Sequence, residues 1–206
     1  YCATIAKGEE PARVIYLSTS GVYGDGSDEP VTEESIPNPT TSRGKRRLDG
    51  ERAFTAFCQE RDIPLVILRV TGIYGPGRLP IRQITEGQPL LREDIAPLTN
   101  RIHADDLASV ALAAAQRGEG GDIYNVSDGH PTTMNTYFNA VADACGLPRP
   151  RQVSLEEARQ LMSPLMFSYA TESRRLDSQK MLSKLGVTLH YPDLLAGISA
   201  SCDPDA

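Results

Sequence analysis

Hydroxyl-bearing residues are concentrated at the end of the first apolar segment of the chain. Ser18, Thr19 and Ser20 directly follow the apolar run at residues 14–17 and lead into the turn Gly21-Val22-Tyr23-Gly24. A short, continuous apolar run is typical of a strand covered on both faces of a parallel sheet. Ligands of open α/β sheets bind outside the carboxyl ends of the strands, so these hydroxyl groups are predicted to face a cofactor. Taken alone, the segment is equally well explained as a polar turn that caps a strand.

A glycine-rich segment follows the next apolar run, at residues 65–68. It reads Thr71-Gly72-Ile73-Tyr74-Gly75-Pro76-Gly77, which looks like a phosphate-binding turn. Pro76 and Pro80 disfavour a helix that starts immediately, and no acidic residue ends a further strand about 20 residues later. We therefore interpret the segment as a loop on the substrate side.

Two arginines four positions apart stand near the start of the next predicted helix. Arg43 and Arg47 would share one face of that helix. A guanidinium keeps its proton near neutrality, but it can hold a carboxylate or phosphate with two hydrogen bonds. Several cations at a helix N-terminus oppose the helix dipole, and an anion from cofactor or substrate would relieve that cost. The alternative is a solvated basic turn in which Arg47 pairs with Glu51.

Four segments, at residues 18–24, 68–77, 100–107 and 124–128, together resemble the extended short-chain dehydrogenase/reductase superfamily. Its best-known members are NAD-dependent nucleotide-sugar epimerases and dehydratases. The resemblance implies an α/β fold with a doubly wound, Rossmann-like parallel sheet and a small C-terminal substrate lobe. It also implies NAD or NADP as cofactor and a small-molecule substrate. The family's first strands and glycine-rich phosphate-binding segment are absent from this sequence, so we expect it to begin within a longer protein and to bind cofactor poorly as an isolated fragment.

Family members usually carry Tyr-x-x-x-Lys at the start of the helix after Thr40, and the tyrosine is the general acid/base. Aligning the helix by the family's pattern puts Arg43 at the tyrosine position and Arg47 at the lysine position. This register rests on three matches, Gly44, Leu48 and Glu51. A register that pairs Thr41 with Lys45 loses all three matches. Neither register supplies a tyrosine, so the active site is expected to be atypical.

The resemblance assigns roles to further residues of the same segments. Thr19 takes the position of the catalytic Ser/Thr that hydrogen-bonds the reacting hydroxyl, and completes a predicted catalytic set with Arg43 and Arg47. The predicted cofactor contacts are Ser18, Thr19, Arg47, Thr71, Gly72 and Ile73, and the predicted substrate contacts are Ser20, Arg78 and Arg101. Dehydratases place Asp-Glu after the catalytic Thr, where this chain has Ser20-Gly21, so a sugar dehydratase is not expected. The phosphate-binding arginine of the epimerases falls near Thr99.

Other reactive side chains in these segments are interpreted as structural. Tyr23 and Tyr74 lie in Val-Tyr-Gly and Ile-Tyr-Gly motifs that are common in the family, and they are expected to be packing residues. His103 with Asp105 and Asp106 could form a catalytic pair or metal site, but a carboxylate near a helix start more commonly caps it. We predict no metal site.

Apolar spacing predicts the elements that position these residues. A helix should begin near Thr40, with its buried stripe at Gly50, Ala53, Phe54, Phe57 and Cys58. Further helices are predicted around residues 107–114, 134–145 and 181–185, the last with a Gly186 cap, and a strand at residues 122–126. Ser154 to Glu157 has capping-box spacing. We predict a dinucleotide-binding part at residues 1–127, to which 77–102 adds a substrate-side segment, and a substrate lobe at 128–206.

Composition excludes several classes of function. The 206 residues carry a net charge of −6, which argues against nucleic acid as the main partner. No apolar run approaches the roughly 18 residues of a membrane helix, and no signal peptide opens the chain, so a cytoplasmic location is expected. Four cysteines lie far apart without a Cys-x-x-Cys pair. This spacing predicts buried or idle thiols, and neither a zinc site nor a disulfide framework.

The sequence thus predicts an NAD(P)-dependent oxidoreductase or epimerase acting on a small hydroxylated substrate, either an anion or a nucleotide sugar. The proton would travel by water or by an unassigned residue. The alternative is a non-catalytic dinucleotide-binding sensor or regulatory protein, which the missing tyrosine and lysine favour. A homodimer is expected by analogy alone.

Overall fold

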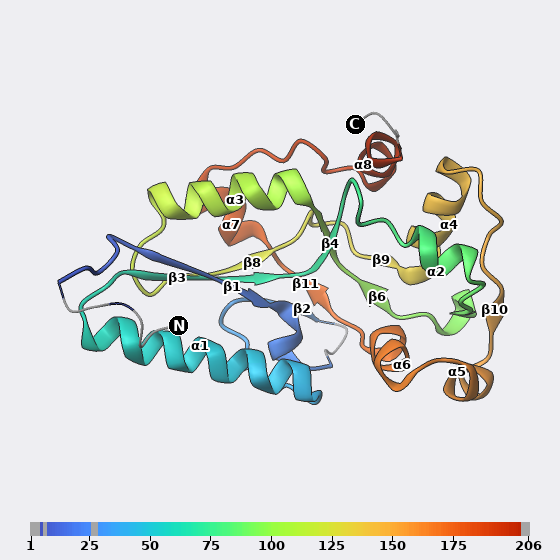
Figure 1. Ribbon diagram of the computed structural model, residues 1–206, viewed down its shortest axis with the longest axis horizontal. Coiled ribbons are helices and arrows are strands. Elements are labelled where there is room, and N and C mark those ends of the chain that lie inside the picture. Colours follow the sequence, from blue (N-terminus) through green and yellow to red (C-terminus); the bar gives the residue numbers. More distant parts are fainter. Residues whose placement is uncertain (1–4, 6–7, 26–28, 203–206) are drawn as a thin grey trace.

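A parallel three-stranded sheet lies at the centre of the computed structural model, which describes residues 5, 8–25 and 29–202 (Figure 1). The strands are β1 (Val14–Thr19), β3 (Leu65–Val70) and β8 (Ile123–Val126), in the order β1-β3-β8. Val14 lies opposite Leu65, and Ile67 lies opposite Ile123. Polar residues that follow β1 and β3 therefore meet at one edge of the sheet.

Helices cover both faces of this sheet, which confirms the predicted doubly wound α/β class. Alternate side chains of β3 point to opposite faces. Leu65 and Ile67 pack toward α1 (Ser42–Glu60), whereas Val66 and Leu68 pack toward α3 (Ala104–Arg117) and α7 (Gln179–Leu185). Figure 1 shows α1 on one side of the strands and α3 with α7 on the other.

The two central strands differ in burial. Every residue of β3 is buried, as the apolar run predicts. β1 is only partly buried, and Leu17 is 46% exposed, because β1 is the edge strand of the described sheet. The expectation of a strand covered on both faces thus holds for β3 and fails for β1.

The first turn of α1 lies close to the end of β1. Thr41 caps the helix by accepting a hydrogen bond from the Gly44 amide. A side chain at Gly44 would bring its Cβ within 2.7 Å of the Gly21 carbonyl oxygen, so glycine is needed for this approach. The buried face runs through Gly44, Leu48, Glu51 and Cys58, whereas Ala53, which was predicted to be buried, is exposed.

The remaining helices pack beside the sheet or at its carboxyl edge. They are α2 (Ile81–Thr85), α4 (Met134–Ala144), α5 (Leu155–Leu161), α6 (Pro164–Thr171) and α8 (Leu194–Ser201), with 3₁₀ turns at Ser20–Tyr23 and Glu93–Ile95. The capping box at Ser154 and the left-handed Gly186 cap are both present, as predicted. α7 packs into the main core although it lies within the predicted C-terminal lobe.

Four short strand pairs lie outside the central sheet, and two of them include strands of the C-terminal third. β4 (Gly72–Tyr74) pairs with β7 (Arg101–His103), β6 (Leu98–Thr99) with β9 (Thr132–Thr133), β5 (Leu90–Leu91) with β10 (Gln152–Val153), and β2 (Pro30–Val31) with β11 (Arg175–Leu176). These pairs hold the loops after β3 and before α3 beside α4 and α6.

Cys145 and Cys202 form a disulfide, which contradicts the prediction of idle thiols. The two cysteines end α4 and α8, whose apolar faces share one core cluster, so packing brings together residues 57 positions apart. Cys58 is on the buried face of α1, and Cys2 lies outside the described residues. Among the described helices, none is long and apolar enough to cross a membrane.

Candidate active site

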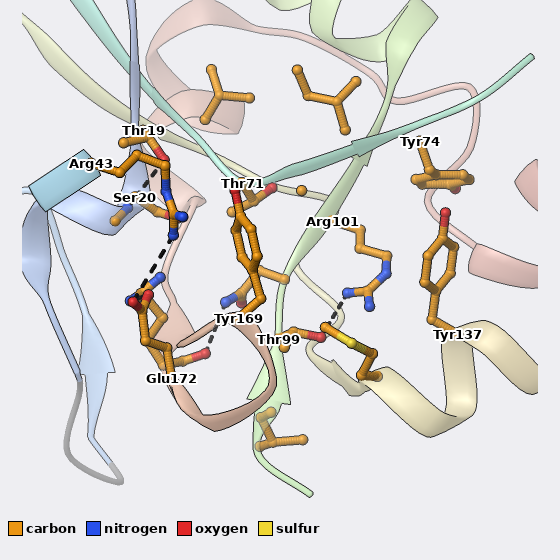
Figure 2. Close-up of a pocket in the computed structure, with 18 of the residues that line it drawn as sticks. Thr19, Ser20, Arg43, Thr71, Tyr74, Thr99, Arg101, Tyr137, Tyr169 and Glu172 are labelled. Atoms are coloured by element: carbon orange, nitrogen blue, oxygen red, sulfur yellow. Dashed lines mark hydrogen bonds and ion pairs between the residues drawn. The ribbon is translucent and has the colours of Figure 1, made fainter. Parts of the chain in front are cut away.

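A pocket of about 450 Å³ opens at the carboxyl ends of β1 and β3. Its walls come from the ends of both strands, the first turns of α1, the segment 98–101, α4, and the residues around the end of α6 (Figure 2). The pocket brings together most of the predicted site residues: Ser18, Thr19, Ser20, Arg43, Arg47, Thr71, Gly72, Ile73 and Arg101. Arg78 does not line it and is exposed in the loop after Gly77.

Three hydroxyl groups at this edge differ in their hydrogen bonding. The Ser18 hydroxyl donates to the buried Glu51 carboxylate, and the Thr71 hydroxyl donates to the Val126 carbonyl at 3.0 Å. The Thr19 hydroxyl oxygen accepts from the Gly21 amide at 3.2 Å. Its proton therefore remains available for a ligand in the pocket, which suits a group that orients a reacting oxygen.

A buried ion pair fixes α1 beneath the pocket. Arg69 donates through Nε and Nη2 to the two carboxylate oxygens of Glu51, at 3.2 and 2.8 Å, and both side chains are at most 5% exposed. Burial would lower the pKa of Arg69, but the hydrogen bonds and charges of Glu51 and Tyr23 together outweigh it and raise that pKa. Glu51 therefore does not pair with Arg47, and the alternative of an Arg47–Glu51 surface pair is wrong.

Arg43 and Arg47 both reach the pocket from α1. Arg43 lies over the ring of Tyr169 at 4.0 Å and faces the Glu172 carboxylate, with 4.0 Å between Nη2 and Oε1. Arg47 donates to the Leu17 carbonyl at 3.1 Å. Lys45, which belongs to the rival register, is exposed and lies outside the pocket.

Arg101 stands on the opposite side of the pocket and is only 6% exposed. Its Nη1 donates to the Thr99 hydroxyl at 2.7 Å, and its guanidinium lies 4.0 Å above the ring of Tyr137. Burial lowers the pKa of Arg101 to about 10, although the charge of Asp128 opposes this shift. Figure 2 shows Tyr169 between Arg101 on one side and Arg43 with Thr19 on the other.

Comparison with known proteins identifies the family. Residues 2–127 match the NAD dependent epimerase/dehydratase family. The chain belongs to that family. It is 32% identical over 144 residues to the uncharacterised protein y4nG of Sinorhizobium fredii, covering 67% of this chain and 36% of that protein. The matched relatives are thus longer than this chain.

Solved structures agree with the assignment of the fold. A functionally unknown conserved protein from Silicibacter pomeroyi superimposes with a TM-score of 0.81 at 33% identity, over 91% of this chain and 64% of that one. A UDP-glucuronic acid 4-epimerase from Bacillus cereus, in complex with NAD, gives 0.72 at 23% identity, over 93% and 60%. The second likeness concerns the fold alone.

Several pocket residues of this family member were missed by sequence reasoning. Tyr137 and Tyr169 line the pocket from α4 and α6, and Glu172 and Arg174 follow α6. The Ser163-Pro164 pair, an N-cap followed by proline at the first helical position, is the signal that could have located α6. Tyr74 was predicted to be a packing residue, and it is 1% exposed with its ring edge against Tyr137.

His103 and Asp106 make structural contacts, but their roles differ from expectation. The His103 ring, and not a carboxylate, caps α3 by accepting from the Asp105 amide. Asp106 is fully buried and accepts hydrogen bonds from the amides of His190 and Tyr191. Within the part of the chain that the structure describes, no group of three or more His, Cys, Asp or Glu is arranged to hold a metal ion.

The pocket residues fit a nicotinamide cofactor. Thr19 offers a donor, and the exposed backbone of Gly72 and Ile73 forms a wall at the end of β3. A Cβ at Gly72 would lie 3.3 Å from the Asn100 carbonyl oxygen, which is a tight contact. These residues would hold the nicotinamide end, which supplies a hydride acceptor or donor when bound.

Proposed function

We propose that this protein is an NAD(P)-dependent oxidoreductase or epimerase acting on a small hydroxylated substrate, either an anion or a nucleotide sugar. The proposal rests on the pocket at the carboxyl ends of β1 and β3. It combines the Thr19 hydroxyl, two arginines of α1 and the Gly72–Ile73 wall. Membership of the family supports a nicotinamide cofactor, and either NAD or NADP is compatible with these residues.

In this proposal Thr19 orients the reacting hydroxyl by a hydrogen bond, and the nicotinamide takes or returns hydride. Arg43 and Arg47 bind and position the ligand, because a guanidinium group is not an acid/base catalyst near neutral pH. Residues 128–206 act as the substrate lobe, because α4 and the segment after α6 wall the pocket opposite the cofactor residues.

The proton of the substrate hydroxyl leaves through the Tyr169 hydroxyl or through water. Three phenols line the pocket, but Tyr74 and Tyr137 are nearly inaccessible. Burial raises the pKa of Tyr137 to about 12 and raises that of Tyr74 still further. Tyr169 is 41% exposed and touches Arg43, so it is the pocket phenol that both substrate and solvent can reach.

The test uses the complete protein with NADH and NADPH. We expect fluorescence titration to detect binding of at least one of them, and absorbance at the nicotinamide band to report turnover on a panel of hydroxy acids, alcohols and sugar nucleotides. Thr19→Val should abolish turnover while binding persists, and Thr19→Ser, which keeps the hydroxyl, should retain it. Binding without turnover across the panel would favour the sensor alternative, and absence of binding would refute the proposal. A cytosolic location and a homodimer remain predictions.

A further inference from the structure

Arg101 is a buried cation whose bidentate edge has no protein partner. Thr99 holds Nη1, and the Thr99 hydroxyl is itself committed as a donor to the Thr132 carbonyl at 2.8 Å. Among the described residues, neither Nε nor Nη2 of Arg101 has a hydrogen-bond acceptor, and no carboxylate lies within ion-pair distance. Arg69 uses the same Nε–Nη2 edge to hold Glu51. The corresponding edge of Arg101 is therefore preoriented and unfilled by protein.

The other pocket arginines have internal partners. Glu172 accepts from Arg174 at 2.6 Å and faces Arg43 at 4.0 Å, so one carboxylate serves two guanidinium groups. Arg47 donates to a main-chain carbonyl and is exposed to water. The anion expected at Arg43 is thus supplied by the protein itself, and Arg101 is the arginine that the fold leaves uncompensated.

Charge and burial make this arrangement costly without a ligand. A buried charge is normally paired, because its desolvation is expensive. The pocket is lined by four arginines and Glu172, whereas the protein as a whole has a net charge of −6. Asp128 lies near enough to attract Arg101, but its Oδ1 accepts from the His130 amide and it does not line the pocket. An acidic protein with a cationic pocket is suited to an anionic ligand.

We infer that Arg101 is the subsite for an oxyanion group of the substrate, a carboxylate or a phosphate, held by its Nε and Nη2. Arg101 lies across Tyr169 from Thr19, so the charge and the reacting hydroxyl sit on opposite sides of the pocket (Figure 2). The substrate class is accordingly a compact hydroxy acid or a phosphorylated alcohol. This assignment of substrate rests on the proposed function, whereas the anion subsite does not.

The experiment measures anion binding by the complete protein in the absence and presence of saturating NADH. The probes are malonate and inorganic phosphate, titrated at constant ionic strength against chloride and followed by calorimetry. Saturating NADH blocks phosphate sites that belong to the cofactor. We expect Arg101→Met to weaken the better-bound probe at least tenfold, and Arg101→Lys to weaken it less. The matched control Arg78→Met removes an exposed arginine outside the pocket and should leave the affinity unchanged.

The two probes distinguish the source of the oxyanion, since a carboxylate site prefers malonate and a phosphate site prefers phosphate. The subsite is overturned by any of three results: unchanged affinity in Arg101→Met, a loss of affinity in Arg43→Met instead, or no binding of either probe to the wild type. If Arg101→Met does not fold, Arg101→Lys with its weaker bidentate grip decides the matter, and an unchanged affinity there overturns the subsite. Arg101-dependent anion binding without nicotinamide binding would refute the proposed function and support the subsite. Nicotinamide binding without Arg101-dependent anion binding would refute the subsite and leave the proposed function unaffected.

Discussion

Replacing Glu51 by leucine should destabilise the protein more than any change at its surface ion pairs. The substitution keeps much of the side-chain volume but removes the acceptor of three hydrogen bonds, two from Arg69 and one from Ser18. The Arg69 side chain is 4% exposed and would be left as an uncompensated buried charge. Breaking a buried pair in this way costs roughly 3–5 kcal/mol of the free energy of unfolding.

The measurement is urea unfolding of the wild type, Glu51→Leu, Arg69→Met and the double variant. The double variant removes both charges, so its free energy of unfolding should recover to within about 1 kcal/mol of the wild type. Asp49→Ala serves as the matched control, because Asp49 pairs with Arg52 on the same helix with both side chains 71% exposed. Its effect should stay below about 0.5 kcal/mol. A cost below about 1 kcal/mol for Glu51→Leu, or a double variant no more stable than the single ones, would refute the reasoning.

Three further predictions concern a buried carboxylate, the disulfide and the pocket phenol. Burial raises the pKa of Asp128 from 3.8 to about 6, so the folded state binds more protons than the unfolded state between these values, and stability falls as pH rises through them. Asp128→Asn should remove this loss and be more stable at pH 7.5 by up to about 3 kcal/mol in urea unfolding; a steeper pH profile in the variant contradicts the prediction. Exchanging both Cys145 and Cys202 for serine should lower the free energy of unfolding by about 2–4 kcal/mol, and dithiothreitol should destabilise only the wild type; equal sensitivity of both proteins would argue against the bridge. Tyr169→Phe keeps the ring against Arg43 and should slow turnover about 100-fold with NADH affinity unchanged, whereas an unaltered rate would assign the proton to water.

The position of α1 relative to the pocket could be predicted from the sequence because local constraints fix it. Gly44 is required by the close approach to Gly21, and Leu48 and Glu51 lie one and two turns further along the same buried face. The family's pattern through Gly44, Leu48 and Glu51 selects the register that turns Arg43 and Arg47 toward the pocket. Helix periodicity alone predicted a stripe that includes Ala53, which is exposed.

Pairing between distant elements could not be predicted in the same way. The partner of Glu51 is Arg69, which lies within an otherwise apolar strand, and the disulfide joins residues 57 positions apart. Each pair depends on how a helix packs against another element, and the sequence spacing contains no direct signal for that packing. A charged residue inside a fully buried strand is the clue that could have been used, since such a charge needs a partner.

The location of the pocket's unpaired charge follows from the same distinction. The helix dipole argument predicts a negative group near the cations at the start of α1. That group is Glu172, which follows α6 and lies 129 residues after Arg43 in the sequence (172 minus 43). Arg101 comes from a three-residue buried strand, and no carboxylate of residues 8–25 or 29–202 lies within ion-pair distance of its free edge. A buried charged side chain that has no oppositely charged partner in the protein therefore marks a candidate ligand site. Anion affinity should therefore fall in Arg101→Met and not in Arg43→Met. This comparison tests which arginine lacks a protein partner, and it needs no assumption about the substrate.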